Sequence, residues 1–85
     1  MTSEVVVTLY SRPGCHLCDE ARQGLEKLLG EGARFELREV DIEGDDSLHR
    51  EMLELIPVVE VNGVRVSELI FEPDAVIARL DTFVP

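Results

Sequence analysis

Ser11-Arg12-Pro13-Gly14-Cys15-His16-Leu17-Cys18-Asp19-Glu20 is the stretch that decides the fold, and it contains both cysteines of the chain. The run before it, residues 5–10, is apolar and rich in β-branched side chains, which is typical of a strand covered on both faces. A helical pattern of apolar residues follows, from Cys15 to about Leu29. A Cys-x-x-Cys pair where a strand gives way to a helix indicates a redox dithiol.

The two cysteines are spaced for thiol–disulfide exchange. This reaction needs a thiolate, and the start of a helix offers unpaired N–H groups and a positive dipole end. We therefore expect Cys15 to ionise more readily than a free cysteine, with Arg12 and protonated His16 adding to the effect. Position i+3 lies on the same side of a helix as position i, so Cys18 can attack a mixed disulfide formed at Cys15.

Strand and helix patterns alternate along the rest of the chain. Residues 35–41 predict a second strand, and a short helix capped by Asp46 or Ser47 follows it. A last helix begins near Pro73 and turns residues 76, 77 and 80 inward. The order β-α-β-α-β-β-α over one domain, residues 1–85, predicts an α/β fold with a central mixed four-stranded sheet and helices on both faces.

A hairpin signal lies between the second and third helices. Asn62-Gly63 separates two valine-rich runs, which favours a two-residue type I′ turn. The expected register has valines together on one face and opposite charges facing each other on the other, and it pairs Val61 with Val64, Glu60 with Arg65 and Val59 with Val66.

Composition and charge narrow the classes of function. The chain has 85 residues and a formal net charge of −10, and an acidic surface repels phosphate backbones, so no nucleic-acid partner is expected. No run approaches the roughly 20 apolar residues that span a bilayer, and no secretory signal is visible, so we expect a cytoplasmic protein without a membrane partner. In the cytoplasm a lone cysteine pair is more often catalytic or metal-binding than a structural disulfide.

Tyr10–Cys18, followed by Ile56-Pro57-Val58-Val59 and the hairpin, resembles the glutaredoxin-like branch of the thioredoxin superfamily over nearly the whole chain. The resemblance implies a thioredoxin fold. It also implies a role for five positions: Cys15 as nucleophile, Cys18 as resolving thiol, Pro57 as the cis-proline facing the dithiol, the Ile56 backbone pairing with an incoming disulfide substrate, and Arg12 as a basic residue near the nucleophile. The implied function is a monomeric thiol–disulfide oxidoreductase acting on protein or small-molecule disulfides, with no metal and no cofactor.

Two departures from the glutaredoxin pattern bear on the electron donor. His16-Leu17 replaces the usual Pro-Tyr between the cysteines, and Ser67-Glu68-Leu69-Ile70 replaces the Gly-Gly-x-Asp of glutathione-binding members. Glu68 would repel a glutathione carboxylate, which argues against glutathione as the donor. Phe71-Glu72-Pro73-Asp74 is similar to the tail of redoxins that a thioredoxin reductase recharges, so another thiol or a reductase is the expected donor.

Two alternatives use the same residues. The cysteine pair could hold a metal ion or an iron–sulfur cluster shared between two subunits, although structural zinc needs four ligands and the chain offers only two cysteines and two histidines. The chain could also be a non-catalytic adaptor with a thioredoxin-like fold, but an intact dithiol argues against that interpretation.

Overall fold

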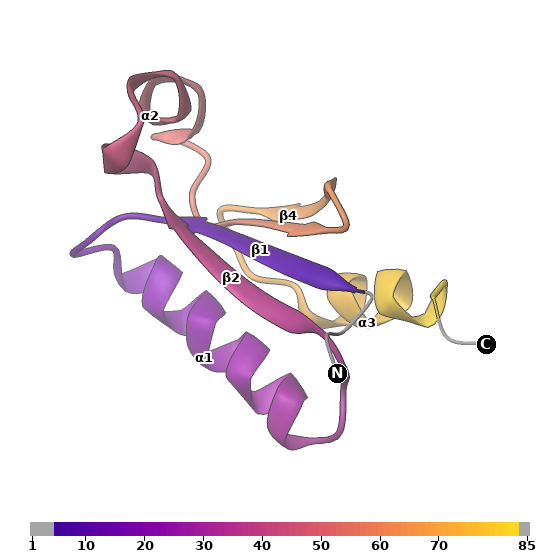
Figure 1. Cartoon of the computed structure of the whole chain (residues 1–85). Coiled ribbons are helices and arrows are strands. Elements are labelled where there is room, and N and C mark those ends of the chain that lie inside the picture. Colours follow the sequence, from indigo (N-terminus) through magenta and orange to yellow (C-terminus); the bar gives the residue numbers. More distant parts are fainter. Residues whose placement is uncertain (1–4, 84–85) are drawn as a thin grey trace.

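The computed structural model describes residues 5–83, which form a four-stranded mixed sheet with three α-helices (Figure 1). The predicted order β-α-β-α-β-β-α is confirmed. The predicted domain, 1–85, extends past the described residues at both ends. The elements are β1 (Val6–Ser11), α1 (His16–Gly30), β2 (Glu36–Asp41), α2 (Asp46–Met52), β3 (Val58–Val61), β4 (Val64–Glu68) and α3 (Pro73–Asp81), with a 3-10 turn over Ile42–Gly44 before α2.

The strand order β2-β1-β3-β4 and the strand directions bring three connecting segments to one end of the sheet. β1 runs parallel to β2 and antiparallel to β3, and β3 is antiparallel to β4. Tyr10 near the end of β1 therefore pairs with Val58 at the start of β3, and Val58 pairs in turn with Glu68 at the end of β4. The cysteine loop, the segment before β3 and the segment after β4 all meet at this end of the sheet.

α1 and α3 pack against one face of the sheet and form the main core (Figure 1). Buried residues alternate along β1, and this period of two matches a strand with one face on the core. The main core consists of ten buried residues: Val7, Leu9, Ala21, Leu25, Leu28, Phe35, Val59, Val61, Val76 and Leu80.

A second buried group, which we call the site cluster, lies where β1, β3 and α2 meet. It consists of Cys18, Ile42, Met52, Ile56 and Val58. Leu48 of α2 and Tyr10 of β1 pack against it. In the sheet, Tyr10 and Val58 alternate with the main-core residues Leu9 and Val59, so α2 covers the face opposite α1 and α3. The expected helices on both faces are thus present.

The hairpin confirms two predicted pairs and corrects the third. Val61 pairs with Val64 and Glu60 with Arg65, but Val59 pairs with Ser67, because a bulge shifts the register. The extra residue in β4 is Val66, which packs against the main core. The pattern of valines and opposite charges within the hairpin does not predict this bulge, because the contact of Val66 with the main core involves residues outside the hairpin.

Two local expectations change in detail. Asp45, one residue before the predicted cap, accepts from the N–H groups of Ser47 (2.8 Å) and Leu48 (3.1 Å) and so caps α2. Ile77, which was expected to face inward, is 40% exposed, whereas its neighbour Val76 is buried.

No helix within residues 5–83 combines the length and the apolar character needed to cross a bilayer.

Candidate active site

Cys15 occupies the N-cap of α1, the position where a side chain can meet the unpaired N–H groups of the first turn. Its backbone is extended (φ −91°, ψ 107°), and its sulfur accepts a hydrogen bond from the Cys18 N–H at 3.2 Å. The Cys15 carbonyl accepts from the Asp19 N–H at 3.1 Å, which starts the helical ladder. The amide geometry that favours a thiolate at this sulfur is therefore already built into the helix start.

Cys15 and Cys18 form a disulfide, with their Cα atoms 5.2 Å apart. Cys15 is partly exposed, while Cys18 is fully buried within the site cluster. The two sulfurs therefore differ in access: an incoming molecule can reach Cys15, but Cys18 is enclosed by protein.

The segment before β3 contributes the wall beside the dithiol. Ile56 belongs to the site cluster together with Cys18, and Cys15 packs against that cluster. The Ile56–Pro57 peptide bond is cis, as the family resemblance implied, and Pro57 is fully buried. The Ile56 N–H donates to the Met52 carbonyl at 3.0 Å, so only the carbonyl of Ile56 is left for an external partner.

The two basic side chains predicted near the nucleophile point to solvent. Arg12 is exposed, and its side chain has no hydrogen bond or ion pair with residues 5–83. His16 lies 3.5 Å from Glu20 on the next turn of α1, and both side chains are mostly exposed. Neither residue is hydrogen-bonded to a cysteine sulfur, so the structure leaves them at the rim of the site.

A charged network that links residues on both sides of the cysteine loop was missed by sequence reasoning. Glu39 of β2 accepts from the Ser11 hydroxyl at 2.7 Å and is bound by both Nε (2.7 Å) and Nη2 of Arg22. Nη1 of Arg22 also binds Asp19 at 2.8 Å. The hydrogen bonds from Arg22 are the main cause of the lowered pKa of Glu39, and the same bonds raise the pKa of Arg22.

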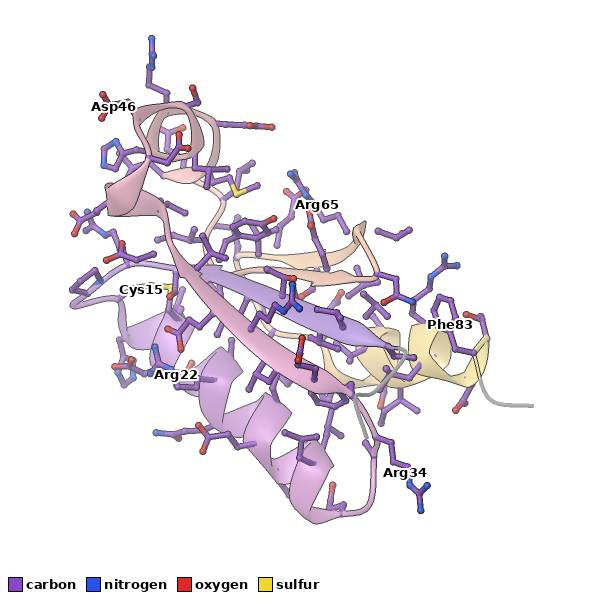
Figure 2. All side chains as sticks on the ribbon, in the orientation of Figure 1. Cys15, Arg22, Arg34, Asp46, Arg65 and Phe83 are labelled. Carbon is purple, nitrogen blue, oxygen red and sulfur yellow. A yellow bond between two sulfur atoms is a disulfide. The ribbon has the colours of Figure 1, made fainter. Side chains whose placement is uncertain are left out.

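Only part of this network carries a sequence signal. Asp19 and Arg22 are three residues apart on a helix, which is a favourable spacing for an ion pair. Glu39 is 17 positions away from Arg22, and their contact depends on how α1 lies over β2. Figure 2 shows Arg22 on the side of the sheet that carries α1, whereas Arg65 lies on the other side.

Exposed apolar side chains lie in the loops at the end of the sheet that carries Cys15. Leu17, between the cysteines, is 43% exposed, and Leu69 and Ile70, directly after β4, are 46% and 70% exposed. Leu69 has a positive φ of 63° and its N–H donates to the Leu55 carbonyl at 2.9 Å, which ties this loop to the segment before Pro57. The candidate site thus has an apolar rim on two sides.

Among residues 5–83, no three His, Cys, Asp or Glu side chains come together as a possible metal site.

Comparison with known proteins agrees with the fold and the cysteine pair. The sequence matches the family described as "Glutaredoxin-like domain (DUF836)" over residues 6–83. A curated glutaredoxin from Haemophilus influenzae is 46% identical over 39 residues, a region that covers 46% of this chain and 45% of that protein. The match therefore spans less than half the length of this relative.

Solved structures with similar folds cover almost the whole chain. Protein Ne2328 from Nitrosomonas europaea is 26% identical with a TM-score of 0.76, covering 93% of this chain and 94% of that one. Protein XcR50 from X. campestris is 29% identical with a TM-score of 0.70, covering 93% and 99%. The oxidised thioredoxin from Plasmodium falciparum, 17% identical with a TM-score of 0.63 and coverage of 98% and 84%, shows the shared fold alone.

Proposed function

The chain belongs to the glutaredoxin-like domain family (DUF836) of the thioredoxin superfamily, and from that premise we propose that it is a dithiol thiol–disulfide oxidoreductase. The family and the Cys15–Cys18 pair support a thiol redox role. The observation that carries the proposal is the difference between the two sulfurs: Cys15 is accessible at the start of α1, and Cys18 is enclosed one turn later.

The reaction that this arrangement supports has two exchange steps. In the reduced protein, the Cys15 thiolate attacks one sulfur of a substrate disulfide, and the other substrate sulfur leaves as a thiolate that takes a proton from water. Cys18 then loses its proton and attacks the Cys15 sulfur, which releases the second substrate thiol. The protein gives up two electrons and ends as the Cys15–Cys18 disulfide, and an external donor restores the dithiol.

The apolar rim indicates the kind of substrate. Leu17, Leu69 and Ile70 would contact apolar side chains that flank a disulfide in a protein, in addition to the sulfurs themselves. The Ile56 carbonyl offers one acceptor to an N–H of the substrate backbone, since its own N–H is engaged by Met52. We assign Arg12 to substrate binding at the outer rim and His16 to tuning of the charge there.

The charges after the hairpin bear on the donor. Glu68, at the end of β4, forms an ion pair with Arg65 at 3.1 Å, and both side chains are partly exposed. The pair presents no unpaired cation to the two carboxylates of glutathione. We therefore propose that a reductase or another low-molecular-weight thiol supplies the electrons, and that the protein works as a cytoplasmic monomer on disulfide-containing proteins.

An insulin-reduction assay tests the activity and the donor together. The assay is run with dithiothreitol, with glutathione, glutathione reductase and NADPH, and with thioredoxin reductase and NADPH. We expect turnover with dithiothreitol and with thioredoxin reductase, and little with glutathione. No turnover above a Cys15→Ser control with any donor would contradict the oxidoreductase.

The role of Cys18 is tested separately. Cys18→Ser should leave the first exchange step intact but block the second, so a mixed disulfide with the substrate should accumulate and be visible by mass spectrometry. Unchanged turnover in Cys18→Ser would contradict the resolving role. Metal analysis of protein purified without added metal distinguishes the metal-binding alternative.

A further inference from the structure

The four side chains Ser11, Asp19, Arg22 and Glu39 form a continuous polar chain around the cysteine loop. Ser11 is the last residue of β1, Asp19 and Arg22 lie on α1, and Glu39 lies on β2. One oxygen of Glu39 binds the Ser11 hydroxyl at 2.7 Å, and the other binds Nε of Arg22 at 2.7 Å. The carboxylate therefore links the residue before the loop to the helix after the loop.

Ser11 explains why this link is more than a surface ion pair. Its residue is 3% exposed, so its hydroxyl has little access to water and would be left unpaired without Glu39. A buried polar group that is left unpaired destabilises the fold, because nothing replaces the hydrogen bond it would make to water. Glu39 and Arg22, in contrast, are about one-third exposed, so their mutual attraction alone is weak.

The charges have a second consequence for the dithiol. Asp19 lies four residues after Cys15, one helical turn away, and a nearby carboxylate disfavours a thiolate. Glu39 adds a second negative charge, which is held near Asp19 because Arg22 binds both carboxylates. Arg22 binds both carboxylates and offsets one of the two charges, in a chain whose formal net charge is −10.

We propose that Glu39 and Arg22 are positioning residues of the dithiol: Glu39 holds the two ends of the cysteine loop, and Arg22 compensates the acidic side chains so that Cys15 can ionise. This inference rests on the proposed function. It assigns roles in the same site to two residues outside the Cys-x-x-Cys motif.

Other ionisable groups face the same region and stay constant in the test. On α1 they are His16 and Glu20, and Arg12 lies in the loop. From β1, Tyr10 packs against the site cluster, and burial followed by the charge of Glu60 raises the pKa of Tyr10, so it stays neutral near pH 7. None of them binds Arg22 or Glu39, so substitutions at these two positions change the network alone.

The test measures the alkylation rate of Cys15 by iodoacetamide in the reduced full-length protein at neutral pH, which reports its thiolate fraction. Arg22→Gln should lower the rate by roughly two-fold, because the two carboxylates lose their compensating charge. Glu39→Gln should raise it by roughly two-fold, because it removes a negative charge and keeps an oxygen that can accept from Ser11. Both changes should shrink at high salt.

Three controls separate charge from loss of structure. Arg38→Gln breaks the Glu36–Arg38 ion pair on the other face of β2, so it should leave the rate unchanged. Arg22→Lys keeps the charge and should stay near the original rate. If Glu39→Gln does not fold, Asp19→Asn replaces it in the test. It should also raise the alkylation rate, because it also removes one carboxylate.

The opposite signs are the decisive result. If Arg22→Gln and Glu39→Gln both lower the rate, the network acts only as structural support, and the assigned charge role is wrong. If neither changes the rate, the whole inference is overturned. If the two variants show these opposite shifts but the original protein reduces no disulfide, the proposed function is refuted instead, so the two failures are distinguishable.

Discussion

The main core and the site cluster differ in what surrounds them. The main core lies between the sheet and two helices and contains only apolar side chains. The site cluster lies at one end of the sheet and contains Cys18. It borders loops that carry Cys15 and exposed leucines. The comparison indicates that the first region sets the stability of the fold and that the second holds the partly exposed Cys15 at the surface.

The largest expected effect comes from removing the accessible sulfur. Cys15→Ser should reduce disulfide-reducing activity by at least about a thousand-fold, because the hydroxyl is a far weaker nucleophile than a thiolate. Its free energy of unfolding should match that of the reduced original protein, since Cys15 only borders the site cluster. Insulin reduction and urea denaturation measure the two quantities.

One outcome would contradict this contrast between the two regions. If Cys15→Ser also lost several kcal/mol of stability relative to the reduced protein, the site would be part of the structural core. Denaturation of both proteins under the same reducing conditions decides the matter.

A truncation in the main core should have the reverse pattern. Leu25 of α1 is fully buried in the main core, and Leu25→Ala should lower the free energy of unfolding by about 3 kcal/mol through lost burial and a cavity. The activity of the folded protein at low temperature should stay within about two-fold, because no atom of Leu25 belongs to the site cluster. A large loss of activity in folded protein would show that the two regions are coupled.

Two glycines of α1 sharpen the comparison within a single helix. A Cβ atom at Gly24 would overlap the ring of Phe71, whereas one at Gly30 would meet no atom within 4 Å. We expect Gly24→Ala to destabilise the protein by about 1 kcal/mol, since the clash outweighs the gain in helix propensity. Gly30→Ala should be neutral or stabilise it by up to about 0.5 kcal/mol.

Thermal unfolding of the two glycine variants shows whether each substitution stabilises or destabilises the protein. If both variants were stabilised, the Phe71 ring would move aside at little cost, and the close packing of α1 against the segment after β4 would not matter. Phe71→Leu in the Gly24→Ala background should restore part of the lost stability.

How far the sequence predicts this molecule depends on the range of the interaction. The Cys-x-x-Cys boundary, the Asn62-Gly63 turn and the helix start at Pro73 are local signals, and the structure has a helix or turn at each of them. The contact of Gly24 with Phe71 joins residues that lie far apart in the sequence, so helical periodicity could only flag the glycine as unusual.

The site follows the same rule. The cysteines and the cis bond before Pro57 were expected from the motif and the family resemblance, respectively. The pairing of Arg22 with Glu39 was not, because it depends on which residues of β2 face α1. The bulge at Val66 also follows from packing, and no pairing rule within the hairpin requires it.

The smallest expected effect concerns how the free energy of unfolding changes at acidic pH. Because Arg22 lowers the pKa of Glu39, this carboxylate stabilises the fold fully at pH values above its unfolded pKa of roughly 4.3. The contribution is lost as the pH falls through the lowered pKa of the folded state. Since the Glu39 side chain is 36% exposed, solvent screening limits it to about 0.5 kcal/mol.

Urea denaturation at a series of pH values tests this contribution by comparing the original protein with Glu39→Gln. The difference in unfolding free energy should be constant near neutral pH and should shrink by about 0.5 kcal/mol between about pH 5 and about pH 3. Arg38→Gln is the matched control on the same strand, and its difference should change little over this range, because its pair with Glu36 is more exposed. A pH-independent difference for Glu39→Gln would mean that the ion pair beside the dithiol adds no charge-dependent stability, so the network would stabilise the loop through the Ser11 hydrogen bond alone.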